Sequence, residues 1–221
     1  MFPLYDTIPS SKRAYVNYVI IFANIAVFLY ELTFFSSETM LDNFFYTYGF
    51  VPSKMFSSFP FLAIFTHMFI HGGWLHIIGN MWFLKIFGDN VEDTMGHFKY
   101  FLFYITGGIF ALFFYVVFNP LSPYPLVGAS GAISAVMGAY FVLFYYSRIV
   151  SLIFLIFPFI VEIPALIYLF YWFIIQVLNG LLSNAAGTGG RLLGTHRWIH
   201  LWRILGCEIQ KKEILVLTLN A

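Results

Sequence analysis

The sequence predicts an all-α fold, a polytopic helix bundle that spans a membrane. Of the 221 residues, 61% are hydrophobic and only 10% are charged, whereas soluble domains carry about 25% charged residues. So few charged side chains cannot cover a globule in water, but they suit a protein that is surrounded by a lipid bilayer. Several apolar segments also approach or reach the roughly 20 residues that a membrane-spanning helix needs.

Five of these segments are expected to be spanning helices. The first follows Lys12 and Arg13, and the fifth follows a segment that contains two prolines. Residues 149–159, directly after Arg148, are too short to span and are expected to lie at the membrane interface. The predicted spans comprise residues 15–35, 67–88, 98–118, 129–146 and 163–178.

The basic residues predict how the chain is oriented. Lysine and arginine favour cytoplasmic loops, so Lys12 and Arg13 place the N-terminus inside the cell. Alternating spans then put Lys99 and Arg148 on the same side, in agreement. Three arginines within thirteen residues of the tail, Arg191, Arg197 and Arg203, oppose insertion of a complete sixth span. The predicted division is a cytoplasmic N-terminus at 1–14, a membrane domain at 15–189 and a divergent tail with a degraded sixth span at 190–221.

Composition also limits the partners. The net charge of +1 gives no indication of a nucleic-acid partner. The single Cys207 excludes an internal disulfide framework. The opening MFPLYDTIPSSKR has no apolar core, so no cleavable signal peptide is expected.

The string GASG at residues 128–131 opens the fourth predicted span and allows two interpretations. Ser130, Ser134 and Gly138 are four residues apart, a stripe of small residues that lets helices pack closely. Alternatively, Ser130 is a nucleophile in the first turn of a helix, where unpaired backbone N–H groups can bind an oxyanion.

A second polar cluster opens the second predicted span. His76 and Asn80 are four residues apart and share one helix face, where both can donate hydrogen bonds to an oxyanion. His67 and His71 have the spacing of a metal-binding pair, but no third ligand at a useful spacing completes a site. Packing and anchoring of loop backbone explain these two histidines better, and no metal is expected.

These motifs resemble those of the rhomboid family of intramembrane serine proteases. FTHMFIHGGWLHIIGN at 65–80 is similar to the second-span motif, and GASG to the nucleophile motif. The opening MFPLYDTIPS and FPFIVEIP at 157–164 resemble prokaryotic members. The resemblance extends over residues 1–185.

The resemblance implies a six-helix bundle with a water-filled cavity open to the outside. Ser130 would be the nucleophile, and His76, Asn80 and the Ser130 N–H would stabilise the oxyanion. Neither metal, nucleotide nor other cofactor is implied. The expected substrates are transmembrane proteins cut near the membrane boundary, and the expected location is the inner membrane of a prokaryote.

The tail departs from this pattern. The family's general base is a histidine within AHxxG on the sixth span, and no AHxxG occurs here; His196 and His200 lie in the corresponding region among arginines. Residues 191–205, RLLGTHRWIHLWRIL, can be encoded so that a one-base shift reads AYWAHIGGFIFGAF. We therefore interpret the tail as the product of a frameshifted or misassembled gene, which the coding DNA would test.

Two other functions stay open from the sequence. One is a catalytically inactive rhomboid-like protein that binds transmembrane helices, because a serine is a poor nucleophile without a base. The other is a transporter or channel, against which spans one, three and five are interpreted as free of intramembrane charges.

Overall fold

A computed structural model describes residues 1–35, 37–154 and 157–185. Five long helices carry the fold: α1 Tyr15–Glu31, α4 Trp74–Met95, α5 His97–Phe118, α6 Ser130–Leu143 and α7 Ala165–Ala185. The short 3₁₀ helix η1, Leu32–Phe34, extends α1. Each of the five predicted spans therefore overlaps one of these five long helices.

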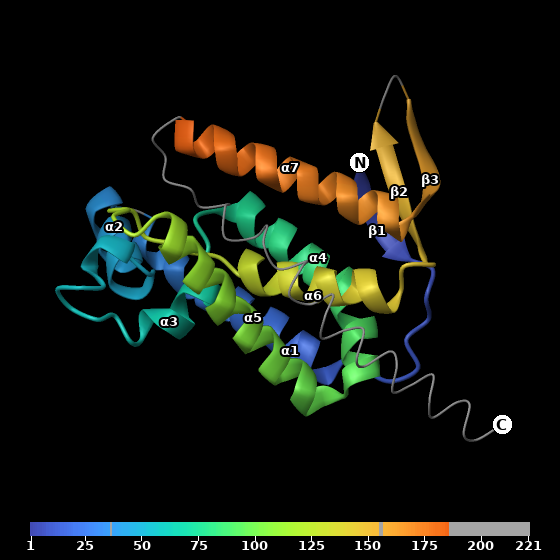
Figure 1. The fold of residues 1–221 in the computed structure, drawn as a ribbon, viewed down its shortest axis with the longest axis horizontal. Coiled ribbons are helices and arrows are strands. Elements are labelled where there is room, and N and C mark those ends of the chain that lie inside the picture. Colours follow the sequence, from blue (N-terminus) through green and yellow to red (C-terminus); the bar gives the residue numbers. More distant parts are fainter. Residues whose placement is uncertain (36, 155–156, 186–221) are drawn as a thin grey trace.

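Helix α6 is the inner helix of the bundle. It packs against α5 on one side and α4 on another, and α7 crosses nearby (Figure 1). Most of its residues are buried, including Ala132, Ala135 and Gly138. Such small side chains let neighbouring backbones approach closely, which is how helices associate inside a bilayer.

The second predicted span begins later and ends later than the sequence indicated. Residues His67–Phe69 form the 3₁₀ helix η3, and α4 begins only at Trp74. Gly73, with a φ of 149°, separates the two, because this backbone conformation suits glycine and breaks a helix. At the other end α4 continues to Met95, where Gly96 with a φ of 78° ends it.

The residues between the first two predicted spans contain further helices. These are α2 Glu38–Tyr48, η2 Pro52–Lys54 and α3 Ala63–Thr66. The Ser37 hydroxyl caps α2 by accepting a hydrogen bond from the Met40 N–H at 3.4 Å, as N-cap serines do. Together α2 and α3 form one end of the molecule (Figure 1).

A three-stranded antiparallel sheet forms the opposite end, and it corrects the all-α prediction. Strand β1, Phe2–Asp6, pairs with β2, Arg148–Phe154, which pairs with β3, Pro158–Pro164. The prediction of an interfacial segment at 149–159 missed this hairpin. The β-branched residues of β2 and β3 favour strands, and the prolines of β3 lie at its ends, where they remove no central hydrogen bond.

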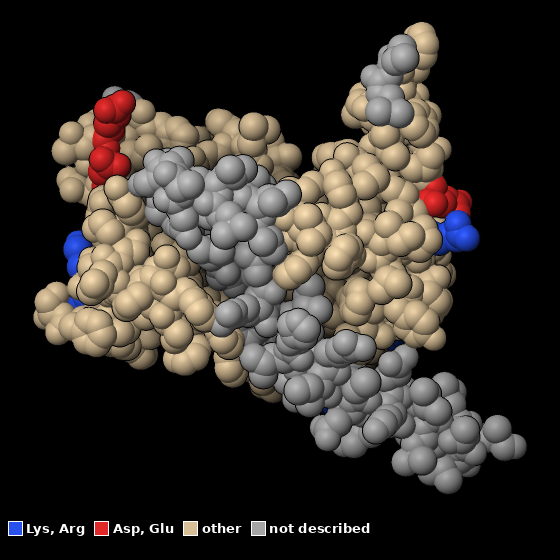
Figure 2. Space-filling view, turned by 45° about the horizontal axis from the view of Figure 1, so that its top comes forward, with Lys and Arg blue, Asp and Glu red and all other residues tan. Residues whose placement is uncertain are grey.

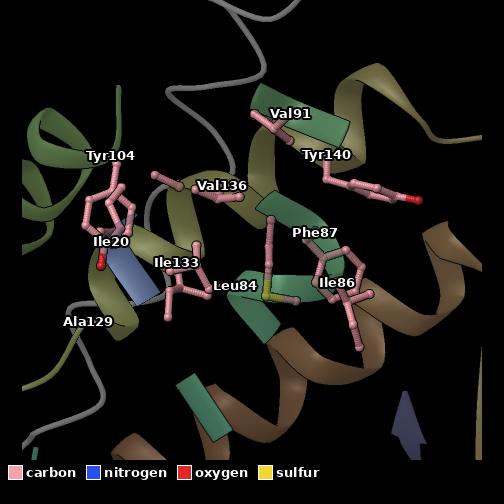
Figure 3. Close-up of a cluster of buried hydrophobic side chains, with 14 of the residues drawn as sticks. Ile20, Leu84, Ile86, Phe87, Val91, Tyr104, Ala129, Ile133, Val136 and Tyr140 are labelled. Carbon is pink, nitrogen blue, oxygen red and sulfur yellow. The ribbon is translucent and has the colours of Figure 1, made fainter. Parts of the chain in front are cut away.

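The core lies where α1, α4, α5 and α6 meet. Figure 3 shows Leu84 and Phe87 of α4 beside Ile133 and Val136 of α6, with Tyr104 of α5 close by. All of these side chains are 0 to 2% exposed. This packing fixes the position of α6, whose first residue is Ser130.

The visible surface and two of the helices agree with a location in a membrane. In Figure 2 most of the visible blue and red side chains lie at the two ends of the face, and the described surface between them, drawn tan, shows few charged side chains. In the described part of the chain, Tyr15–Phe34 and His97–Phe118 are long and apolar enough to cross a bilayer. The apolar helices Ser130–Leu143 and Ala165–Ile175 are shorter, and α4 carries four charged residues from Lys85 onward. The count of five spans therefore stays a prediction.

Candidate active site

Ser130 begins α6 and follows a connecting segment that is bent by Gly128. Gly128 has a φ of 120°, a conformation that L side chains rarely adopt. Ala129 then takes helical dihedrals, with φ −70° and ψ −9°, and is fully buried. The Ser130 side chain is thereby held at the helix N-terminus, where the first backbone N–H groups have no partner within the helix.

His76 and Asn80, from the first two turns of α4, reach the same place. A Cβ atom added to Gly128 would lie 2.7 Å from both Cε1 and Nε2 of His76, and 3.8 Å from Nδ2 of Asn80. Both donors therefore lie beside Gly128, which is two positions before Ser130. The structure thus brings His76 and Asn80 to the segment that leads into Ser130, although 50 residues separate Asn80 from Ser130.

The side chains of His76 and Asn80 can both donate hydrogen bonds to a negatively charged oxygen. Asn80 is 9% exposed, and among the described residues its Nδ2 has no hydrogen-bond partner. A buried unpaired donor is costly, so its presence needs an explanation, such as a ligand that arrives during reaction. The Nδ1 atom of His76 accepts the Gly72 N–H at 3.4 Å. A neutral imidazole that accepts at Nδ1 carries its proton on Nε2 and can donate from there.

His67 ties the segment before Ser130 to the rest of the site. Its side-chain Nδ1 donates to the Ala63 carbonyl at 2.9 Å, and its own carbonyl accepts the Gly128 N–H at 2.8 Å. An isolated antiparallel β-bridge between Phe50 and Leu126 adds two backbone hydrogen bonds to the same segment. The buried His67 is thus placed as a scaffold residue.

The small residues near Ser130 also pack α6 tightly against α5. A Cβ atom at Gly131 would lie 2.5 Å from the Ala111 Cβ, and one at Gly107 would lie 2.6 Å from the Ala135 Cβ. The Ser134 hydroxyl is buried and donates to the Ser130 carbonyl at 2.7 Å. Close packing and a catalytic serine are therefore compatible interpretations of the same segment.

The structure supplies no base for Ser130 from the residues it describes. Over 1–35, 37–154 and 157–185, the Ser130 hydroxyl makes no hydrogen bond to a histidine. His196 and His200, the two sequence candidates, lie outside the described residues. In the same part of the chain, no three metal-ligating side chains gather into a site.

One buried charged residue near the site was missed in the sequence. Span one was interpreted as free of charges, but Glu31 lies within it and is 0% exposed. Its carboxylate accepts the His71 N–H at 3.0 Å. A single acidic residue inside an apolar segment is a default functional candidate. Glu31 could therefore have been identified from the sequence alone.

Comparison with known proteins agrees with the motifs. A rhomboid domain model matches residues 59–203, which include His76, Asn80 and Ser130. "Rhomboid-like protein 11, chloroplastic" of Arabidopsis thaliana is 31% identical over 129 residues, covering 58% of this chain and 42% of the relative. "Rhomboid-related protein 2" of Mus musculus is 32% identical over 90 residues, covering 41% and 28%. The matches thus span less than half the length of either relative. The family model covers more than half of this chain, which therefore belongs to the rhomboid family and, with its apolar helices, is an integral membrane protein.

Proposed function

We propose that this protein is an intramembrane serine endopeptidase that cleaves transmembrane proteins near the membrane boundary. The observation that carries the proposal is the convergence of His76 and Asn80 on Gly128, two residues before Ser130. A nucleophile beside two side-chain donors is the arrangement that acyl transfer requires. Membership of a family that consists largely of serine proteases supports it.

In this mechanism the Ser130 oxygen attacks the carbonyl carbon of the scissile peptide bond. The carbonyl oxygen becomes negative and receives hydrogen bonds from His76 Nε2, Asn80 Nδ2 and the Ser130 N–H. One such donor contributes on the order of a hundred- to a thousandfold in kcat. A base must take the serine proton. The AHxxG histidine in AYWAHIGGFIFGAF, the tail as read after the one-base shift and called here the shifted tail, would fill this role.

A second function is favoured by one specific observation. The printed sequence has no AHxxG, and the described residues place no histidine in hydrogen-bond contact with Ser130. A chain without a base would bind transmembrane helices without cutting them. The two functions differ in whether Ser130 becomes reactive.

The proposed location is the inner membrane of a prokaryote, with the N-terminus in the cytoplasm. The opening and the segment before α7 resemble prokaryotic members, and Lys12 and Arg13 support the orientation. The substrate-binding cavity would then open to the outside.

The test uses a fluorophosphonate probe on the protein carrying the shifted tail, in detergent. We expect labelling that Ser130→Ala abolishes and that Ser122→Ala, a hydroxyl in the segment before α6, leaves intact. Labelling that persists in Ser130→Ala would exclude Ser130 as the nucleophile. Absence of any labelling would favour the inactive helix-binding protein.

A further inference from the structure

Glu31 occupies a position that is unfavourable for a carboxylate. It is the last residue of α1 and is 0% exposed. The C-terminal end of a helix carries partial negative charge, which disfavours an acidic side chain there. Burial adds a desolvation cost that an apolar residue would avoid. An acidic residue at a position that both effects disfavour suggests a functional constraint.

The carboxylate holds the peptide that leads into the candidate active site. Its Oε2 accepts the His71 N–H at 3.0 Å, across 40 residues of sequence. Among the described residues, its other oxygen has no partner, and neither has Nε2 of the buried His71. The His71 N–H bond is thus the contact by which Glu31 acts on its surroundings in the described structure.

This contact is one peptide away from the hydrogen bond that orients His76. Gly72, the next residue, donates its N–H to His76 Nδ1 at 3.4 Å. The rings of His71 and His76 also lie edge to face, with centroids 5.1 Å apart. Fixing the His71 peptide therefore limits the positions open to the Gly72 N–H and to the His76 ring.

From this sequence of contacts we propose that Glu31 is a positioning residue for the oxyanion donor His76. By holding the segment from His71 to Gly72, Glu31 keeps a donor at His76 Nδ1, and His76 keeps its proton on Nε2, facing Gly128. The geometric claim concerns His76 alone, and its catalytic meaning rests on the proposed function. A residue that merely joins α1 to this segment would leave the His76 tautomer unchanged.

The test compares Glu31→Gln with Glu31→Met in the full chain. Glutamine keeps an oxygen that can accept the His71 N–H, whereas methionine fills similar space without an acceptor and suits an apolar site. Asp42→Ala, which removes an exposed carboxylate from α2, is the matched control. The measurement is the ¹⁵N spectrum of labelled histidines in detergent micelles, with His76 assigned by its loss in His76→Ala.

We expect the Nε2–H form of His76 in the unmodified chain, in Glu31→Gln and in Asp42→Ala, and a mixture of tautomers in Glu31→Met. An unchanged His76 signal in Glu31→Met would overturn the proposal, as would an equal change in Glu31→Gln. Thermal unfolding of each variant identifies any loss of fold, and the glutamine comparison holds even if the methionine variant is unstable.

A second readout separates this inference from the proposed function. With the shifted tail, Glu31→Met should lower kcat about tenfold with little change in KM, a smaller loss than His76→Ala, because the donor is misplaced and not removed. If no variant cleaves any substrate, the proposed function fails while the tautomer result still decides the role of Glu31.

Discussion

The substitution Gly128→Ala tests the geometry of the site through one added methyl group. The new Cβ would lie 2.7 Å from His76 Cε1 and Nε2, whereas ordinary contact begins at 3.4 Å. The imidazole must therefore move by about 0.7 Å, the difference between these two distances. The φ of 120° at Gly128 is also unfavourable for alanine.

Backbone strain of this kind costs about 1 to 3 kcal/mol, and displacement of His76 adds to it. We therefore expect Gly128→Ala to lower the free energy of unfolding by at least about 1 kcal/mol. The assay is reversible unfolding in mixed micelles, followed by tryptophan fluorescence, together with the ¹⁵N signal of His76.

Gly79→Ala is the matched control because it lies in the same helix as His76 and directly before Asn80. Among the described residues, no atom outside its own helix backbone and chain neighbours lies within 4 Å of a Cβ at this position, and alanine in a helix is favoured over glycine by about 0.5 to 1 kcal/mol. It should therefore be neutral or stabilising. Equal stability of both variants, with an unchanged His76 signal, would refute the described contact between Gly128 and His76.

Three further predictions concern catalysis, pH and topology. With the shifted tail, Asn80→Ala and His76→Ala should each lower kcat about a hundred- to a thousandfold, the loss expected for one oxyanion donor; unchanged turnover in both would show that they only pack. Burial raises the pKa of Asp6 to about 6 despite its hydrogen bond from Tyr140, so folding favours its protonated form and stability should fall as pH rises from about 4 to 6; Asp6→Asn should lose this dependence in a series of melting curves, and an identical slope would contradict it. A reporter fused after Arg148 should lie in the cytoplasm and one near Leu121 outside, whereas the reverse result would invert the model.

The long helices could be predicted because an apolar segment of sufficient length has few alternatives in a bilayer. The start of α4 could not be predicted from hydropathy. Residues from His67 to Gly73 are as apolar as the helix that follows, and a single glycine conformation separates them. The end of α4 was also missed, because Glu92 lies beyond the apolar segment and is buried by accepting the N–H groups of Val16 and Asn17.

The sheet was missed for a different reason. Strand β1 pairs with β2 across more than 140 residues, with Phe2 opposite Leu152 and Asp6 opposite Ile149. The sequence of neither segment indicates which strand it will pair with. Residues 149–159 alone are equally suited to a segment at the membrane interface. Pairing over this separation is a tertiary property that overrides local pattern.

The candidate site was predictable where its residues share an element or a motif. His76 and Asn80 were identified by helical spacing, and Ser130 by the small residues around it. Glu31 was not, because its link to His71 depends on how α1 packs against the segment before α4. A charge within an apolar span was the available signal.

Cleavage of a model transmembrane substrate tests the central claim most directly. The assay compares the protein that has the unaltered tail with the protein that has the shifted tail, each with and without Ser130→Ala. We expect cleavage by the shifted-tail protein that depends on Ser130. The protein that has the unaltered tail should be inactive, because the arginines around His196 oppose its insertion beside Ser130. Equal, Ser130-dependent cleavage by both proteins would contradict this account of the tail and indicate His196 or His200 as the base. Absence of Ser130-dependent cleavage in both would contradict the proposed protease itself.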